Sequence, residues 1–511
     1  MADKKTTTKD LNDKILKAAR IFRKKLNASE NYKIVLPILF IKRLNDTFDE
    51  NCKKFEAQGK KPDDPVRHRA AGAFYVPKEA RWKNLVDAKK NVAHAIISAC
   101  HAIEDSDKSL EGTMTYQEFN NKKKYPDDKL GELILEFENI ALGNDSLENP
   151  DILGDAFEYL LETFADETKK KGGQFYTPRE VVQLLVRLMD PQPNHSICDP
   201  MCGSGGFLIH SRRYVHKNLK KGENIRGMKL HGQDSNPDTV SMGKMNMILH
   251  EIPNARIEDG DVLEKPKLVE GSQLIKYDRV LANFPFSEDW KPSGKETDAF
   301  GRFKYGIPPG DKKADFAFIQ HMFAALNENG KAAIISGQGT LFRGSKEEEI
   351  RKKMILEDAE NNLQGDIIEG IIALPQKLFY GTSIPGCVYI LNKNKPKERK
   401  NKIIFIYAAR KGHFADLPAR NKLRIQDIEE IESAFKNYKD EYGFCHIADL
   451  EELEENEFNL NIPRYVDVTE PEEPVDISET IKKINEVKDE IILAKKTVSD
   501  DLEELELEIL S

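Results

Sequence analysis

The sequence predicts an α/β protein in which a doubly wound domain follows a helical amino-terminal region and precedes a carboxyl-terminal helix. Three observations lead to this prediction. Strands and helices alternate through the middle of the chain, a pattern typical of a largely parallel sheet. Within that pattern, one short strand ends in the glycine-rich turn Gly203 to Gly206, after which the chain reopens as a helix. Residues 1–165 instead carry apolar positions at helical spacing.

The helical region is expected to cover residues 1–165. Its apolar positions repeat every three to four residues in two stretches, as they do in helices with one buried face. These positions are Leu11, Ile15, Ala18 and Phe22 in the first stretch, and Val35, Ile38, Leu39, Ile41, Leu44 and Phe48 in the second. Residues 166–173, which follow, are polar, rich in lysine and closed by two glycines, a composition typical of a mobile joint.

The α/β domain is expected to span residues 166–465. Its first helix is predicted to start with Thr177 as N-cap, Pro178 at the first helical position and Glu180 completing a capping box. Strands are then expected at residues 197–198, 229–234, 256–257, 277–282, 331–336, 366–374 and 387–391, and residues 403–407 extend the sheet. Mixed helical segments are expected from there to Tyr465.

The last segment, residues 466–511, combines a linker rich in proline and acidic residues with a long amphipathic helix. Steps of four and three residues from Ile477 define a seam in which eight of ten positions are aliphatic. The seam consists of Ile477, Ile481, Ile484, Lys488, Ile491, Lys495, Val498, Leu502, Leu505 and Ile509. It favours packing against partner helices; a helix docked on its own body is the alternative.

Composition narrows the classes of protein that this chain can belong to. The 511 residues are 39% hydrophobic and 32% charged, and the longest apolar run is too short to span a membrane, so we expect a cytoplasmic protein with no membrane partner. The six cysteines form no C-x-x-C pair, which argues against a zinc site, and no metal is expected. The net charge of −9 disfavours a protein that binds nucleic acid alone over a wide surface.

The glycine-rich turn indicates what kind of ligand the domain binds. In the dinucleotide fingerprint a third glycine lets the helix pack on the strand, but Leu208 occupies that place here, which weakens the case for NAD. The carboxylate of Asp199 would repel a pyrophosphate but suits a ligand that carries an ammonium and a sulfonium. S-adenosylmethionine (SAM) is such a ligand, and a purely structural glycine turn is the alternative.

Three motifs resemble those of adenine-N6 DNA methyltransferases and occur in the same order. They are residues 174–179 (QFYTPR), residues 199–207 (DPMCGSGGF) and residues 283–286 (NFPF). Two further runs, residues 153–160 leading into the first motif and residues 459–465, make the chain resemble more closely the modification subunit of type I restriction-modification systems. The resemblance spans nearly the whole chain and implies a Rossmann-like SAM-dependent methyltransferase domain.

The cofactor residues are expected at the ends of successive strands. Asp199 and the backbone N–H groups of the glycine turn would hold the methionine end of SAM, Asp234 would bind the ribose, and Asp261 or Asp259 would address the adenine ring. The resemblance implies that residues 174–179 close the pocket. The cofactor candidates are Gln174, Phe175, Tyr176, Thr177, Pro178, Arg179, Asp199, Met201, Gly203, Ser204, Gly205, Gly206, Asp234 and Asp261.

The acceptor side is expected at Asn283, Phe284, Pro285 and Phe286, which follow a strand. An adenine amine is a poor nucleophile, and two acceptors, the side-chain oxygen of Asn283 and the backbone carbonyl of Phe284, would favour its transition-state geometry. Phe286 would stack on the flipped base. The family's usual motif has proline where this chain has Phe284, which puts the rigidity of the loop in question. An ordinary exit from a strand is the alternative.

The resemblance implies a SAM-dependent adenine-N6 DNA methyltransferase that works within a restriction-modification complex. Its expected partners are double-stranded DNA, a DNA-specificity subunit, a second copy of this chain joined through that subunit, and a restriction subunit. Two alternatives are a non-catalytic SAM-binding DNA clamp and a protein-glutamine N-methyltransferase. Candidates for DNA contact, each with a solvated side chain as the alternative, are Arg302, Lys304 and Tyr305 in a loop, and the basic residues Lys14, Lys17, Arg20, Arg23, Lys24, Lys25, Lys42 and Arg43.

Overall fold

The computed structural model shows two compact units, Met1–Asp467 and Val468–Ser511, which are described separately. The residues that it describes are 5–22, 28–114, 117–149, 151–168, 176–286, 288–291, 298–310, 313–380, 384–418, 420–469 and 477–504. Part of the expected mobile joint, residues 169–173, lies outside these ranges.

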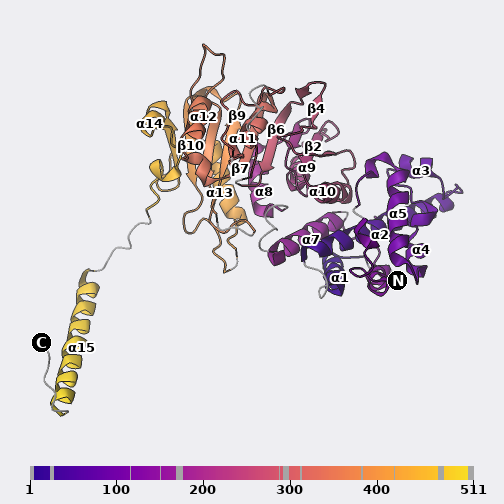
Figure 1. Ribbon diagram of the computed structural model, residues 1–511, viewed down its shortest axis with the longest axis horizontal. Helices are drawn as coiled ribbons and strands as arrows, with labels where there is room; N and C mark the ends of the chain where they lie inside the picture. The colour runs from indigo at the N-terminus through magenta and orange to yellow at the C-terminus, as the bar shows by residue number, and fades with distance from the viewer. Residues whose placement is uncertain are drawn as a thin grey trace. The chain divides into compact units, whose positions relative to one another are not determined.

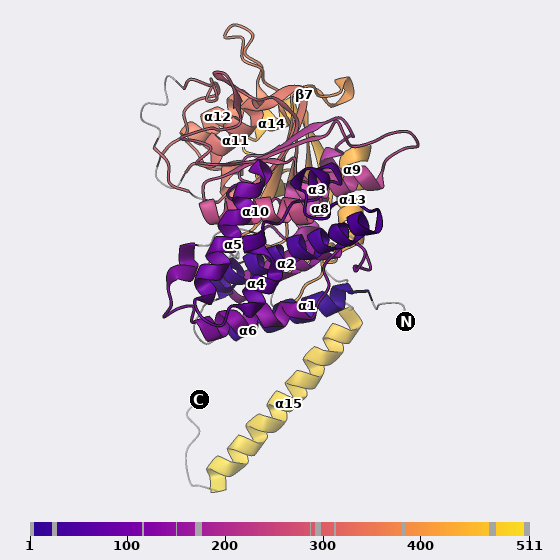
Figure 2. The same cartoon turned by 90° about the vertical axis from the view of Figure 1, so that its right-hand side faces the viewer.

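The amino-terminal part of the first unit is helical, as the apolar periodicity predicted. Its α-helices are α1 (Thr8–Ile21), α2 (Ala28–Ala57), α3 (Pro65–Ala70), α4 (Trp82–Asp87), α5 (Val92–Ser106), α6 (Asp127–Glu138) and α7 (Ile152–Thr168). They gather together in both views of the chain (Figures 1 and 2). The predicted apolar faces of α1 and α2 are buried in one shared core, in which Leu11, Ile38 and Phe48 are fully buried.

A nine-stranded sheet forms the centre of the α/β part (Figure 1). In spatial order it runs β11-β10-β8-β9-β7-β6-β1-β2-β3. Strands β3, β2, β1, β6 and β7 are parallel neighbours, while β9 runs antiparallel between β7 and β8. The bounds are β1 (Ser196–Asp199), β2 (Lys229–Asp234), β3 (Arg256–Asp259), β6 (Tyr277–Asn283), β7 (Leu326–Gly337), β8 (Ile368–Ala373), β9 (Gly386–Asn392), β10 (Lys402–Tyr407) and β11 (Cys445–Asp449).

Helices cover both faces of this sheet, which confirms the predicted doubly wound arrangement. The helices are α8 (Arg179–Met189), α9 (Gly206–Lys217), α10 (Pro237–Leu249), α11 (Asp315–Ala324), α12 (Lys346–Ile355), α13 (Ile425–Asn437) and α14 (Leu450–Glu455). One core joins α11, α12 and α14 to the sheet, and a second core joins α8, α9, α10 and α13 to it. The central strands are therefore buried on both sides, as parallel strands in such folds are.

Two parts of the strand prediction were incomplete. β11 pairs antiparallel with β10 in a segment where mixed helices were expected. It lies at the edge of the sheet and carries His446 and Asp449, so its apolar signal is weak. The short hairpin of β4 (Val269–Glu270) and β5 (Gln273–Leu274) was also not predicted, since two-residue strands leave little pattern.

The second unit contains α15 (Ile477–Glu504), in agreement with the predicted carboxyl-terminal helix. Its aliphatic residues are exposed: Ile481, Ile484, Ile491 and Val498 each keep about half of their accessible surface. The last two seam positions lie outside the described residues. Among the helices that the structure describes, none combines the length and the apolar character needed to cross a membrane.

Buried histidines make the stability of the first unit depend on pH. Burial lowers the pKa of His250 and of His321 to about 3 in each case, so both imidazoles are neutral in the folded chain. In the unfolded chain a histidine titrates near pH 6.5. As the pH falls below that value, the unfolded chain binds protons that the folded chain does not. We expect the free energy of unfolding to fall by up to about 2.7 kcal/mol per pH unit from these two groups.

Urea titrations at pH 7.5, 6.5 and 5.5 measure this dependence. His321→Gln should remove about half of the slope, while the same change at the exposed His216 should leave the slope as it is in the unmodified protein. A slope that does not change in His321→Gln would contradict the assignment.

Candidate functional site

Two adjoining pockets open at the carboxyl ends of β1, β2 and β6. Because β1 pairs in parallel with both β2 and β6, Asp199, Asp234 and Asn283 end their strands along the same edge of the sheet. This is the switch point at which the order of the strands reverses, where such folds bind ligands. Met201 and Asn283 line both pockets. The pocket that contains Asp199 is called the first pocket, and the one that contains Asp234 the second.

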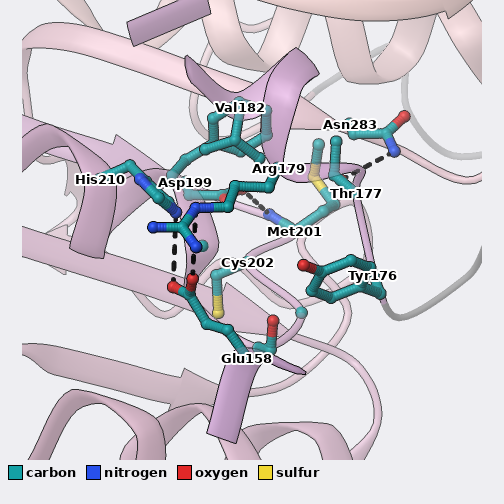
Figure 3. Close-up of a pocket in the computed structure, with 14 residues that line it drawn as sticks. Glu158, Tyr176, Thr177, Arg179, Val182, Asp199, Met201, Cys202, His210 and Asn283 are labelled. Atoms are coloured by element: carbon teal, nitrogen blue, oxygen red, sulfur yellow. Dashed lines mark hydrogen bonds and ion pairs between the residues drawn. The ribbon is translucent and has the colours of Figure 1, made fainter. Parts of the chain in front are cut away.

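The first pocket brings together most of the residues predicted for the methionine end (Figure 3). Asp199 is buried, and its Oδ1 accepts a hydrogen bond from the backbone N–H of Met201 at 3.2 Å. Burial, and to a smaller degree the nearby charge of Asp234, raise the pKa of Asp199 well above its usual range. A cationic ligand would offset both effects. The predicted residues in this pocket are Tyr176, Thr177, Arg179, Asp199, Met201, Gly203, Ser204 and Gly206.

The second pocket contains the acids predicted for the ribose and the adenine ring. The Asp234 carboxylate accepts hydrogen bonds from the backbone N–H groups of Gly203 and Asn236, each at 3.0 Å. Burial raises the pKa of Asp234. Of the two candidates after β3, Asp261 lines this pocket, whereas Asp259 is not among its lining residues. Asp234 therefore fixes the glycine turn and faces the second pocket at once.

Several predicted cofactor residues lie elsewhere. Gly205 does not line either pocket; it is the N-cap of α9 with φ of 83°, and a Cβ there would come within 2.3 Å of Met247 Cε. Its glycine is required by backbone conformation and close packing. Pro178 ends the approach to α8 outside the pocket lining. Gln174 and Phe175 lie outside the described residues.

The predicted helix cap at Thr177 is wrong, and the reason bears on the site. The N-cap of α8 is Pro178, which makes no side-chain capping bond. The Thr177 hydroxyl instead accepts a hydrogen bond from Asn283 Nδ2 at 3.0 Å. Glu180, the other expected cap residue, is buried and accepts a hydrogen bond from Arg420 at 2.8 Å. With its nitrogen held by Thr177, the Asn283 amide turns its oxygen away from that residue (Figure 3).

Phe284 is held by packing. Its ring is 2% exposed and stacks on Phe318 of α11, with ring centroids 5.0 Å apart and planes 21° apart. Phe286 is half-buried and meets Phe284 and Phe379 edge to face, at 6.2 and 6.1 Å. Pro285 lines the second pocket. The backbone that follows Asn283 is therefore anchored through an aromatic side chain in the core.

Several candidates for DNA contact have their polar groups engaged inside the fold. Arg302 is 3% exposed, pairs with Asp298 at 2.6 Å and donates to two backbone carbonyls. Tyr305 is buried and its hydroxyl donates to the Gln364 carbonyl. Lys42 is buried against Asp46. These three candidates are corrected, because each side chain is buried and its polar group has partners in the fold. The Arg43 guanidinium bonds the Leu142 carbonyl and Asn144, and Lys14 pairs with Glu136, but both side chains are partly exposed. Lys304 is exposed, and residues 23–25 lie outside the described ranges.

Five of the described residues that line the first pocket were not predicted from the sequence: Val182, Cys202 and Phe207, and the two polar residues Glu158 on α7 and His210 on α9. The side chains of these two polar residues lie 3.4 Å apart. The signal for Glu158 was its position in an apolar run, between the buried residues Phe157 and Leu160. An acid in such a run is rarely buried without a partner.

The comparisons with known proteins agree with this geometry. The model of a family described as N-6 DNA methylase matches residues 148–474. The chain belongs to the N-6 DNA methylase family. A second family model, the HsdM N-terminal domain, matches residues 11–137, from α1 into α6.

Individual N-6 DNA methylases resemble this one along much of its length. The type I restriction enzyme MjaVII methylase subunit of Methanocaldococcus jannaschii is 31% identical over 510 residues, which cover 96% of this chain and 85% of that protein. The MjaVIII methylase subunit of the same organism is 38% identical over 368 residues, covering 70% of this chain and 60% of that protein. A crystal structure of the type I methyltransferase subunit from Streptococcus thermophilus is 27% identical, with a TM-score of 0.76 over 90% of this chain and 100% of that one.

The packing of Phe284 can be tested by truncation. Phe284→Ala should lower the free energy of unfolding by about 3 to 5 kcal/mol, because it leaves a cavity against Phe318. Phe284→Leu keeps most of the volume and should cost clearly less. Phe342 is 48% exposed, so Phe342→Ala should change stability by no more than about 0.5 kcal/mol. Urea denaturation measures all three variants; equal losses in Phe284→Ala and Phe342→Ala would refute the anchoring role.

Proposed function

We propose that this chain transfers a methyl group from SAM to N6 of adenine in double-stranded DNA, as the methyltransferase subunit of a type I restriction-modification complex. The observation that carries the proposal is the position of Asn283, which lines both pockets at the end of β6. A residue there can reach a cofactor on one side and an acceptor on the other. The names of the relatives, methylase subunits of type I restriction enzymes, support the same activity.

The residues of both pockets fit SAM. SAM supplies a methyl group on a sulfonium, ready for in-line displacement. Asp199 is a buried acid with a raised pKa, which suits the ligand's ammonium. Asp234 and Asp261 line the second pocket, where a ribose and an adenine ring need acceptors. The backbone of Gly203 and Ser204 leads into α9, whose first N–H groups suit a carboxylate.

The acceptor atoms come from the segment after β6. Adenine N6 carries two hydrogens and a lone pair delocalised into the ring. The Asn283 Oδ1 and the Phe284 carbonyl accept from those hydrogens, which favours the tetrahedral nitrogen of the transition state. The bond from Asn283 Nδ2 to Thr177 keeps Oδ1 in the accepting orientation. Phe286 stacks on the adenine after it leaves the duplex.

The choice of a DNA sequence belongs to a partner. The net charge of −9 leaves little sequence-independent attraction to DNA, and Arg302 and Lys42 are engaged in the fold. The exposed aliphatic residues of α15 support a helical partner, since burying such a stripe stabilises helix association. We assign this partner to a specificity subunit that joins two copies of the chain, bound in turn by a restriction subunit.

If Asn283 acts in the transition state, replacing it should lower the rate of methyl transfer without changing SAM affinity. Asn283→Ala should lower the rate of methyl transfer by on the order of a hundredfold or more, with SAM affinity nearly unchanged. Thr177→Val removes the acceptor that orients the amide and should lower the rate by about tenfold. Single-turnover transfer and calorimetry measure the two quantities. A variant of Asn283 that keeps the full rate would refute the role.

The role of α15 predicts that assembly and SAM binding can be separated. Deleting residues 475–511 should leave SAM affinity intact, because none of the described residues in that segment lines either pocket. The deletion should abolish complex formation with the specificity subunit, which size-exclusion chromatography measures. Replacing Ile484 and Ile491 with Lys should act like the deletion, and replacing the exposed Lys482 and Lys496 with Ala should not. Assembly of the truncated chain would refute the role.

The proposed activity as a whole is tested with labelled SAM. The chain reconstituted with its specificity subunit should label adenine N6 in duplex DNA. Labelling of a protein instead of DNA would favour the glutamine methyltransferase, and SAM binding without transfer to either would favour a non-catalytic clamp. Site-specific transfer by the isolated chain would refute the need for a specificity partner.

A further inference from the structure

Helix α7 presents an acidic face to the α/β part of the first unit. Asp155, Glu158 and Glu162 are spaced three and four residues apart and so lie on one side of the helix. Asp155 accepts from Arg213 at 3.0 Å, and Glu162 accepts from the Tyr380 hydroxyl at 3.0 Å. Because α7 also packs on α1 and α2, it links the helical part of the chain to the pocket.

Glu158 is the member of this face that reaches the first pocket. It is 5% exposed, and within the described residues neither carboxylate oxygen accepts a hydrogen bond. Basic side chains surround it at longer distances: His210 Nε2 at 3.4 Å, His250 Nε2 at 3.6 Å, Arg213 at 3.9 Å and Arg179 at 4.0 Å. Burial alone would raise the pKa of Glu158, but the neighbouring histidines and Arg213 outweigh it and lower the pKa to about 2. The carboxylate is therefore charged, buried and surrounded by two imidazoles and two guanidinium groups.

The approach of α7 to the pocket depends on Gly154, one turn before Glu158. A Cβ at Gly154 would lie 2.0 Å from His250 Cε1 and 2.2 Å from its Nδ1. Such distances are not tolerated between real atoms, so any larger residue would force α7 and the His250 side chain apart. Glycine at this position allows the Glu158 carboxylate to reach the pocket wall.

The charges of the first pocket are arranged for a zwitterion. Asp199 is the acid of the pocket, while Arg179 and His210 line it together and point toward Glu158 (Figure 3). Arg179 is 3.6 Å from Asp155 and 4.0 Å from Glu158, both longer than a hydrogen bond to a carboxylate. The guanidinium is thus held electrostatically at the pocket wall. An amino-acid group could direct its ammonium to Asp199 and its carboxylate to Arg179 and His210.

We propose that Glu158 is a positioning residue, which holds Arg179 and His210 so that they bind the carboxylate of the cofactor's methionine end. The inference rests on the proposed use of SAM. It means that the helical part of the chain completes the cofactor site, because the residue that positions these two side chains comes from α7. Without the Glu158 carboxylate, Arg179 and His210 would lose the charge toward which both side chains point and would shift from the pocket wall.

Two nucleoside probes separate this role from a structural one. S-adenosylhomocysteine has the amino-acid end, and 5′-methylthioadenosine lacks it. Glu158→Gln should weaken S-adenosylhomocysteine binding by about tenfold or more, because a charge-assisted contact is lost, and should leave 5′-methylthioadenosine binding within about twofold. Gly154→Ala, which keeps every charge but disturbs the contact between α7 and His250, should give the same selective loss.

The matched control is Glu162→Gln. It makes the same chemical change one turn along α7 and also removes the charge from a bond to the α/β part, yet Glu162 does not line the first pocket. Its affinity for both probes should stay within about twofold of the unmodified chain. Arg179→Gln should show the selective loss, and adding Glu158→Gln to it should weaken binding little further, since Glu158 acts through Arg179.

Calorimetry with each probe and thermal unfolding of each variant decide between the outcomes. Equal losses for both probes, or losses in Glu162→Gln as large as in Glu158→Gln, would overturn the positioning role while leaving SAM as the cofactor. If the unmodified chain binds neither probe, the proposed cofactor itself fails, and the inference fails with it. If Glu158→Gln does not fold, the affinities of Gly154→Ala and Arg179→Gln for the two probes are compared instead.

Discussion

The parallel pairing of β1 with β6 is the constraint on which the site depends. The register Ile197↔Arg279 and Cys198↔Val280 makes both strands end at the same edge of the sheet. Asp199 and Asn283 belong to parts of the chain more than 80 residues apart, yet this pairing brings them to one pocket. Both strands are buried on two faces, so a slip of one residue would send apolar side chains to the wrong core. The rigidity of the site comes from the centre of the sheet.

The strand ends could be predicted because their signals are local. β2 was predicted at its observed bounds from its place in the alternation of strands and helices, and the acid at its end, Asp234, lines the second pocket as expected. Side chains with distant partners could not be predicted. Arg302 looked like a loop cation, but it donates to the carbonyls of Val262 and Leu263, some 40 residues away. Thr177 fits a helix cap by local rules, but a partner 106 residues away takes its hydroxyl.

Glu158 is another residue whose partners could not be predicted from the sequence. Its neighbours lie on α8, on α9 and directly after α10, so nothing within its own helix indicates why a carboxylate can be buried there. The cost of removing a carboxylate from water is offset only by cations that the tertiary fold assembles. The sequence shows only that an acidic residue stands in an apolar run. In the fold this residue lies where α7 contacts basic side chains of the α/β part.

Phe284 shows how a loop can be held without the proline usual in this motif. A proline restrains the backbone by fixing φ, and it does so wherever the loop lies. Phe284 restrains the same segment through its ring, which is buried against Phe318 of α11. At this position the loop is therefore restrained by packing in the core and not by a proline ring. One consequence is that the positions of Asn283 and Phe284, the acceptors that we propose, depend on the position of α11. A change in the packing of that helix would therefore move them.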